Sequence, residues 1–386
     1  MTAKREICAP APRTLSPGTI AFSLMSALAF FLIFFCGETA VTAMKSALAL
    51  CVQRVIPSLF PFMVVSELIV HSGVGELLGR LSAPLLRRLL RVSKAGGSVI
   101  LLGVLCGFPI GAKSAATLYD EGRLSARELS FLLCLCNQPS SAFVTGIVGI
   151  SLFRSYRFGL LLWGITLLSA LLVGLICRLL LSGDTKKADT PTKQKKSATP
   201  SISLFTQSVA NAAGGMLTVC AFVCFFGTLV ACLSALPAMS SLPAPISALL
   251  VGIFELTGGV ARAASLSSPT LAAYTAAWCL GWSGLSVHFQ IMCLCQRKGV
   301  SFRPYFAAKM AQGIMNVALL FVVLRLWPSL LPCKSVPSGV IFDAKSTWQM
   351  WCILTVFGVF VFLWRWGKRK KNTSKIRQKS HVVGEK

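Results

Sequence analysis

Long apolar runs are the feature of this sequence that most limits its fold. Residues 19–36 and 158–181 each contain at most one charged residue. A helix of about 20 apolar residues crosses the hydrocarbon core of a bilayer. Because several such runs follow one another, we expect an all-α polytopic membrane protein. About eight full spans are predicted, near residues 19–36, 47–71, 128–153, 157–181, 205–235, 270–295, 304–327 and 347–366.

The composition supports this class and excludes a soluble globular enzyme. Hydrophobic residues make up 55% of the 386 residues and charged residues only 13%. The net charge of +26 does not indicate nucleic acid binding, because Lys and Arg lie mostly in short loops and tails, where they orient a membrane protein. The 15 cysteines lie almost entirely in apolar runs, so we interpret them as packing residues rather than metal ligands. Walker A, GxSxG and HExxH motifs are missing, and we expect no enzyme activity and no cofactor.

Two basic segments organise the chain. A linker at 182–203 and a tail at 367–386 are expected on the cytoplasmic side, as is the Arg-rich loop near residues 80–94. The linker separates two predicted repeats. The resulting domains are an N-terminal segment with the first span at 1–46, repeats at 47–181 and 204–328, and a last span within 329–366.

Two further apolar stretches, at 98–118 and 246–265, are predicted to enter the membrane and return. If the basic segments are all cytoplasmic, an even number of crossings must lie between them, and each half has one stretch too many. The sequences CGFPIG (106–111) and ELTGG (255–259) contain the Pro and Gly that open a helix. The two re-entrant stretches would open from opposite sides, which predicts an inverted repeat. Interrupted helices at corresponding positions indicate a transporter site near the midplane.

Lys113 and Arg262 end these two interrupted stretches. They occupy matching positions when GVLCGFPIGAK is aligned with GIFELTGGVAR. Each cation alone is explained equally well by contact with lipid headgroups or with a helix C-terminus. Their matched positions favour a joint role, in which both converge on a cavity and bind an anionic or dicarboxylate solute.

Polar clusters interrupt a later apolar helix in each half. They either contact the solute or compensate for backbone groups that Pro and Gly leave free. A histidine in the second cluster, His288, is interpreted either as a proton-coupling group or as a packing residue. The remaining candidates for solute contact are Asn137, Gln138, Ser140 and Ser141 in the first cluster, and Ser283, Ser286 and Gln290 in the second.

Glu67 and Glu255 are the acidic residues deepest in apolar sequence. A carboxylate within a membrane is costly, so a functional role is the first hypothesis. Coupling of transport to protons or sodium ions is one interpretation. A structural ion pair with a cation such as Arg262 or Arg54 is the other, and the sequence leaves both open.

At these motifs the chain resembles the YlbJ-type sporulation integral membrane proteins, also called stage V sporulation protein V. The resemblance rests on LLGVLCGFPIGAKSAATLYDEGRLSARELSFLLCLCNQPSSAFVTGIVG, with IPSLFPF upstream and FELTGG and GWSGLSVHFQ downstream. These proteins carry a nucleoside-recognition gate domain that is similar to part of the concentrative nucleoside transporters. The family usually has FCNNSGP where this sequence has LCNQPSS.

The resemblance implies that the protein exports dipicolinate (pyridine-2,6-dicarboxylate) from the mother cell across the outer forespore membrane. Two carboxylates and a planar ring would suit Lys113 and Arg262 with Phe108 beside them. A non-transporting scaffold or maturation factor for the spore cortex is an alternative, but the matched polar breaks argue against it. A nucleoside transporter is a second alternative, and the paired cations argue against it. The energy source and the oligomeric state stay open.

Overall fold

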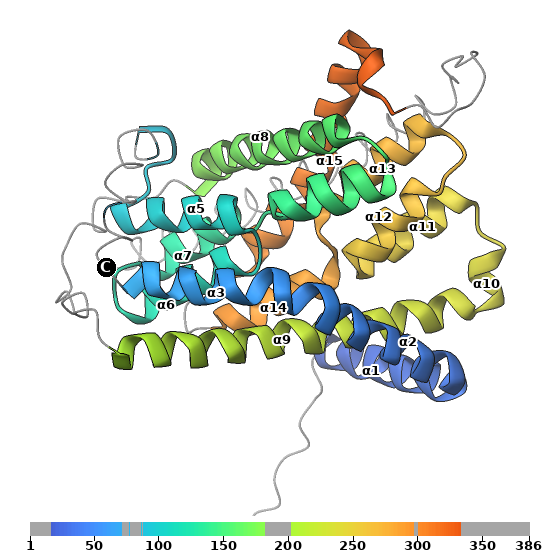
Figure 1. Cartoon of the computed structure of the whole chain (residues 1–386), viewed down its shortest axis with the longest axis horizontal. Helices are drawn as coiled ribbons and strands as arrows, with labels where there is room; N and C mark the ends of the chain where they lie inside the picture. The colour runs from blue at the N-terminus through green and yellow to red at the C-terminus, as the bar shows by residue number, and fades with distance from the viewer. Residues whose placement is uncertain are drawn as a thin grey trace, which may run out of the picture.

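The computed structural model describes residues 17–71, 77, 86, 88–181, 202–296 and 300–332. All regular elements in these residues are helices, which confirms the predicted all-α class (Figure 1). The predicted last span at 347–366, the tail at 367–386 and nearly all of the linker at 182–203 lie outside the described residues. Of the Arg-rich loop, only part is described.

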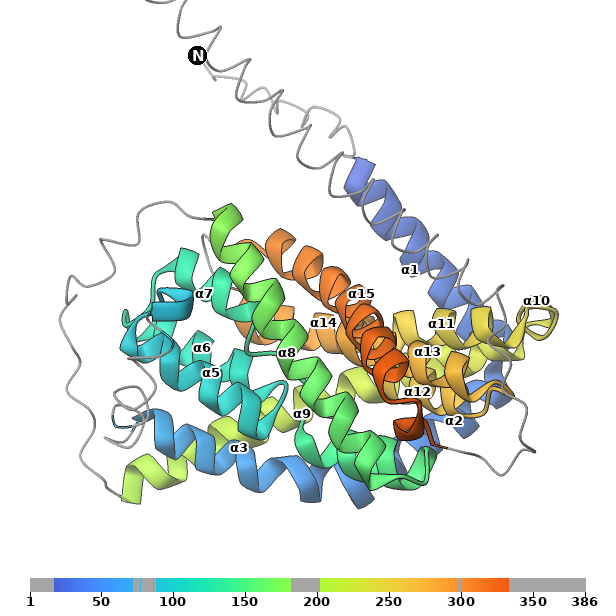
Figure 2. The same cartoon turned by 90° about the horizontal axis from the view of Figure 1, so that it is seen from above.

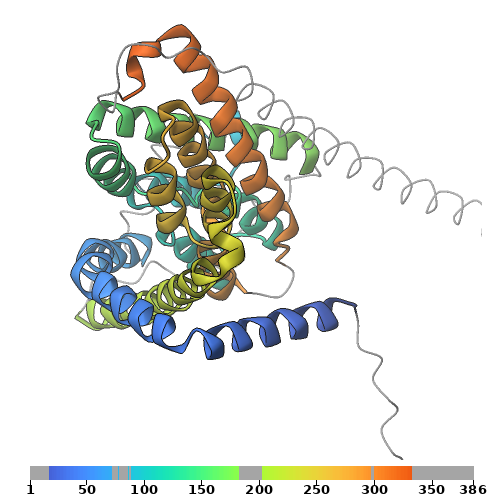
Figure 3. The ribbon, with the colours of Figure 1, turned by 90° about the vertical axis from the view of Figure 1, so that its right-hand side faces the viewer.

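The first helix projects away from the rest of the molecule. α1 (Pro17–Phe35) is apolar along its whole length, and most of its large side chains are exposed. Its axis differs by 97° from that of the segment formed by α2 (Gly37–Leu50) and the start of the π-helical turn η1 (Cys51–Val55). Figure 3 shows α1 extending from the bundle at this bend. The chain then continues into α3 (Ile56–His71).

Three long helices cross the molecule: α8 (Tyr156–Leu181), α9 (Ile202–Ala235) and α15 (Arg303–Leu326). α8 packs against α15, and α3 packs against α9 (Figure 2). By length and composition these three are able to cross a membrane, and the bent pair α1 and α2 would make a fourth span. The described residues therefore contain fewer uninterrupted spans than the sequence predicts.

The predicted interruption of stretch 98–118 is confirmed. α5 (Lys94–Cys106) and α6 (Ile110–Asp120) pack against each other on either side of residues 107–109, and we call this pair the first hairpin. The next predicted span, 128–153, is wrong as a continuous helix. It consists of α7 (Ala126–Leu133), a mainly non-helical stretch at 134–141 and the π-helix η2 (Ala142–Leu152).

The second half repeats this order. α11 (Ala244–Phe254) and α12 (Leu256–Ala264), which follow the short α10 (Pro237–Ser240), form a second hairpin that is interrupted at Glu255 as predicted. The predicted span 270–295 is again divided, into α13 (Pro269–Trp282) and α14 (Gly284–Cys295). Ser283 separates them and has φ of 73°, a left-handed conformation that an α-helix does not accommodate. The 3-10 turn η4 (Pro328–Leu330) follows α15.

Each hairpin packs against the broken helix that follows it. Gly103 and Gly111 face each other across the first hairpin, and a side chain at either would overlap the carbonyl oxygen of Cys136. The facing pair in the second hairpin is Gly252 and Gly259, which lie against Cys279. Only a glycine permits such close approach of two backbones. The two breaks in each half are thereby brought together inside the molecule.

Candidate functional site

A buried lysine lies where the first broken helix meets α15. The side chain of Lys309 is completely buried, at 0% exposure. Its ammonium donates hydrogen bonds to the backbone carbonyl oxygen of Asn137 at 3.0 Å and to Oε1 of Gln312 at 2.7 Å. Both partners are neutral. Among the described residues no carboxylate forms an ion pair with Lys309, so its amino group is enclosed without a counter-charge.

The neighbouring amides extend this contact into a buried network. Nε2 of Gln312 donates to Oε1 of Gln138 at 2.5 Å and to the carbonyl oxygen of Thr166 at 3.1 Å. Asn316 donates to the carbonyl oxygen of Ala277 at 2.9 Å and accepts from Ser169 at 2.5 Å. The network therefore links the first break to α8, α13 and α15.

His288 lies beside this network in α14 and is also completely buried. Its Nδ1 lies 2.7 Å from the hydroxyl of Tyr305, and its ring meets the rings of Trp282, Tyr305 and Phe306 edge-on. Among the residues that the structure describes, its Nε2 has no hydrogen-bond partner, and neither has Oδ1 of the buried Asn137. A buried polar atom without a partner is costly and uncommon, so both atoms are candidates for a hydrogen bond to a bound solute.

Sequence reasoning selected Asn137, Gln138 and His288 but missed their partners in α15. Tyr305, Lys309, Gln312 and Asn316 are separated by four, three and four residues, which places them on one face of a helix. That polar stripe within the apolar span 304–327 is the signal that would have found them.

The other predicted polar residues lie around the breaks. The backbone N–H of Phe108 in the first hairpin donates to the carbonyl oxygen of Gln138 at 2.8 Å. Ser286 accepts a hydrogen bond from Gln290 at 3.3 Å, and both are buried in α14. Further contacts are local: Ser140 accepts from the N–H of Phe143, the carbonyl oxygen of Ser141 accepts from Thr145, and Ser283 donates to the carbonyl oxygen of Leu280.

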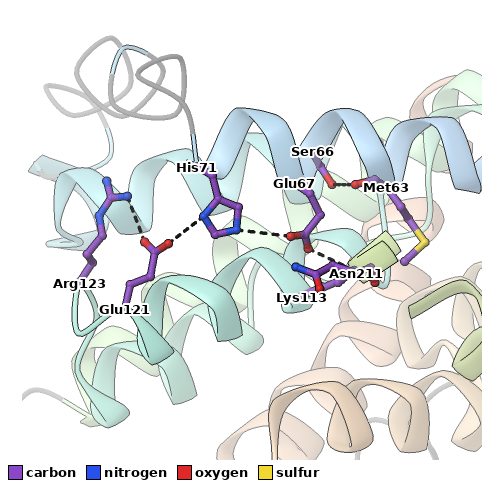
Figure 4. Close-up of polar contacts among 8 residues, drawn as sticks. All are labelled: Met63, Ser66, Glu67, His71, Lys113, Glu121, Arg123 and Asn211. Carbon is purple, nitrogen blue, oxygen red and sulfur yellow. Dashed lines mark hydrogen bonds and ion pairs between the residues drawn. The ribbon is translucent and has the colours of Figure 1, made fainter. Parts of the chain in front are cut away.

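Lys113 belongs to a separate chain of charged groups (Figure 4). Its ammonium lies 3.1 Å from Oε1 of Glu67 and donates to the carbonyl oxygen of Asn211 at 2.6 Å. His71 joins Glu67, at 3.5 Å, to Glu121, at 2.9 Å, and Arg123 lies 3.4 Å from Glu121. Burial raises the pKa of Glu121, but hydrogen bonding and the charges of His71 and Arg123 outweigh burial and lower it. Glu67 thus forms an ion pair with a cation, as one of the two interpretations from the sequence expected, and the described partner is Lys113.

Arg262 and Glu255 have local partners in the second hairpin. Arg262 donates to the hydroxyl of Ser247 at 2.7 Å. Glu255 caps the N-terminus of α12, accepting from the N–H groups of Thr257 at 2.8 Å and Gly258 at 2.5 Å. Arg262 and Lys113 share no partner among the described contacts. The lysine that contacts the first break is Lys309, from a helix that the sequence comparison of the two halves did not include.

No group of three or more His, Cys, Asp or Glu side chains among the described residues is arranged to hold a metal ion. The polar atoms at the breaks belong instead to amides, hydroxyls, an imidazole and an ammonium. Such groups recognise a solute by hydrogen bonds and charge.

Comparison with known proteins agrees with this architecture. Residues 52–154 match the Gate family, described as nucleoside recognition. This part of the chain is therefore similar to a Gate domain. This match includes α3, the first hairpin and the first broken helix. The chain is also similar to the sporulation integral membrane protein YlbJ of Bacillus subtilis (strain 168), with 27% identity over 362 residues that cover 83% of this chain and 87% of that protein.

These findings confirm the resemblance expected from the motifs, and they support an integral membrane protein. No solved structure matches the chain. The Gate match ends at residue 154, so the hairpin and broken helix of the second half lie beyond it. Their likeness to the first half rests on the repeated order of the elements and on the glycine contacts.

Proposed function

We propose that this protein is a membrane transporter that acts in sporulation and exports dipicolinate from the mother cell across the outer forespore membrane. The sporulation role is carried over from the similarity to YlbJ. The substrate is the planar dicarboxylate that the family resemblance implies. The transported species is a small anion, and the lipid bilayer is the protein's other partner.

The observation that carries the transport proposal is the meeting of helix breaks inside an apolar bundle. Phe108 in the first hairpin bonds to Gln138 in the first break, and Trp282 beside the second break donates to Ile253 in the second hairpin at 3.1 Å. Interrupted helices within a membrane are tolerated where they line a solute site. A buried lysine whose described partners are all neutral adjoins the first break, and an anionic solute would stabilise its protonated form.

Lys113 and Arg262 keep a proposed role as binding groups at the ends of the hairpins. In the described conformation each contacts another side chain. Lys113 lies 3.1 Å from Glu67, and Arg262 lies 2.7 Å from Ser247. Binding of an anion would then require these contacts to exchange for contacts with the solute. Coupling to protons or sodium ions through Glu67, Glu255 or His288 is part of the same proposal.

A nucleoside transporter is the alternative that a specific observation favours, because the Gate family is described by nucleoside recognition. Its site would recognise a neutral solute through the amides of Gln138 and Gln312. Lys309 argues against it, since a neutral ligand supplies no counter-charge for the protonated form of the buried amine.

Solute flux into liposomes that contain the purified protein tests the proposal. Dipicolinate should be transported and uridine should not, under imposed proton and sodium gradients measured separately. Lys113→Gln and Arg262→Gln should each reduce dipicolinate flux at matched protein levels, and Arg262→Lys should restore only part of it, because an ammonium lacks the planar two-donor geometry. Transport of uridine but not dipicolinate would select the alternative, and transport of neither would favour a scaffold.

A further inference from the structure

We infer that Lys309 and His288 form the subsite that receives one carboxylate of the transported solute. This inference rests on the proposed function and assigns its anion-recognition step to two residues outside both hairpins. Asn137 and Gln312 hold the lysine when no solute is bound. The subsite is closed to solvent in the described conformation, as expected of a transporter between its two open states.

The environment of Lys309 supports this assignment. An ammonium has three N–H donors, and the described contacts of Lys309 occupy two of them. Enclosing an ammonium with only neutral partners costs free energy, which a carboxylate in contact with it would offset. A carboxylate can take the place of Oε1 of Gln312 without stranding that amide. Gln312 keeps its hydrogen bonds to Gln138 and to the carbonyl oxygen of Thr166.

The position of His288 gives a second and independent indication. Tyr305 precedes Lys309 by one helical turn on the same face of α15, and its hydroxyl contacts Nδ1 of His288. When the Tyr305 hydroxyl donates to Nδ1, the proton of the neutral ring lies on Nε2, the buried atom without a partner. An imidazole N–H and an ammonium together form a donor pair for a carboxylate.

The surrounding rings fit an aromatic carboxylate. Trp282 and Phe306 approach the His288 ring with centroid distances of 4.3 Å and 5.1 Å. Aromatic side chains contact a planar heteroaromatic ring by stacked or edge-on packing. The site therefore combines charge, one N–H donor and aromatic walls, which suits a pyridine carboxylate better than an aliphatic dicarboxylate.

Ligand binding to the purified full-length protein in detergent tests this subsite. Titration calorimetry would compare dipicolinate with pyridine-2,6-dicarboxamide, a neutral analogue of the same shape. Lys309→Met keeps the length and packing of the side chain but removes the charge. We expect it to weaken dipicolinate binding at least about tenfold, the loss of a charge-assisted hydrogen bond, and to weaken dicarboxamide binding by a clearly smaller factor, because an amide oxygen loses a hydrogen bond but no opposite charge. Lys45→Met, at an exposed lysine of α2, is the matched control and should bind both ligands as the wild type does.

A second variant, His288→Asn, keeps a hydrogen-bonding group for Tyr305 and removes Nε2. It should also weaken dipicolinate selectively, and it decides the question if Lys309→Met is not recovered as a monodisperse protein. If the folded variants bind dipicolinate as tightly as the wild type does, the proposed subsite is wrong. The proposed function would still hold in that case, provided that the wild type transports dipicolinate. A wild type that neither binds nor transports dipicolinate would instead remove the proposed function itself.

Discussion

The ammonium of Lys113 lies 3.1 Å from the carboxylate of Glu67, and this pair connects the first hairpin to α3. The same ammonium reaches the backbone of Asn211 in α9, so one side chain holds α6 to two helices outside the hairpin. Glu67 is almost fully buried. Any movement of the hairpin relative to α3 and α9 has to separate these charges or carry them together.

Removing either partner of this pair should destabilise the protein more than removing both. Lys113→Gln leaves the buried Glu67 with His71 as its remaining described partner, and we expect a loss of about 1–3 kcal/mol in the free energy of unfolding. Lys113→Gln with Glu67→Gln should recover part of that loss, because no unpaired carboxylate stays buried. Thermal unfolding in detergent of the wild type, the two single variants Lys113→Gln and Glu67→Gln, and the double variant measures the coupling energy between the two side chains. Strictly additive effects would show that the pair contributes nothing as a pair.

The contact between the first hairpin and the first break should not tolerate a side chain at Gly103. Gly103→Ala places a methyl group against the backbone of Cys136, so a backbone shift is needed, and such overpacking typically costs about 1–3 kcal/mol. Gly164→Ala in α8 is the control, since nothing lies within 4 Å of the added carbon. The control should be neutral or stabilising by up to about 1 kcal/mol. Equal melting temperatures for the two variants would contradict the packing.

Glu255 offers a test that separates capping from ion coupling. Glu255→Ala removes both acceptors for the N–H groups of Thr257 and Gly258, and loss of a cap costs about 0.5–2 kcal/mol. Glu255→Gln keeps one acceptor and should retain most of that stability. If the carboxylate also couples transport to protons, Glu255→Gln will abolish gradient-driven accumulation while counterflow exchange continues. Wild-type accumulation by Glu255→Gln would leave the cap as its role.

The inverted repeat predicts the sides on which the loops lie. The test uses a protein whose reactive native cysteines are replaced and which carries one new cysteine at a time. Cysteines at positions 94 and 193 should be labelled from the cytoplasm. Cysteines at positions 240 and 338 should be labelled from outside. Membrane-impermeant maleimide on intact and permeabilised cells distinguishes the two sides. Cytoplasmic labelling at position 240 would break the inverted arrangement.

The sequence located the interruptions of both hairpins because their cause is local. In the first hairpin Pro109 lacks a backbone N–H and Gly107 adopts φ of 77°, so the helix ends there, and in the second hairpin Glu255 caps the start of α12 through Thr257 and Gly258. It also marked the polar clusters at 136–141 and 281–290, but treated the helices that contain them as continuous. Their average composition is apolar, and the Phe108 contact that satisfies Gln138 in the break comes from another part of the chain.

The long apolar runs, the basic loops and the positions of Pro and Gly thus determine the all-α membrane class and the hairpin breaks, since these follow from neighbouring residues alone. The tertiary structure decided which charges meet. Glu67 pairs with Lys113 of the first hairpin, and Lys309 reaches Asn137 across 172 residues of sequence. In an apolar bundle a charged group takes the partner that helix packing places within hydrogen-bond distance, and that distance is set by which helix faces come into contact.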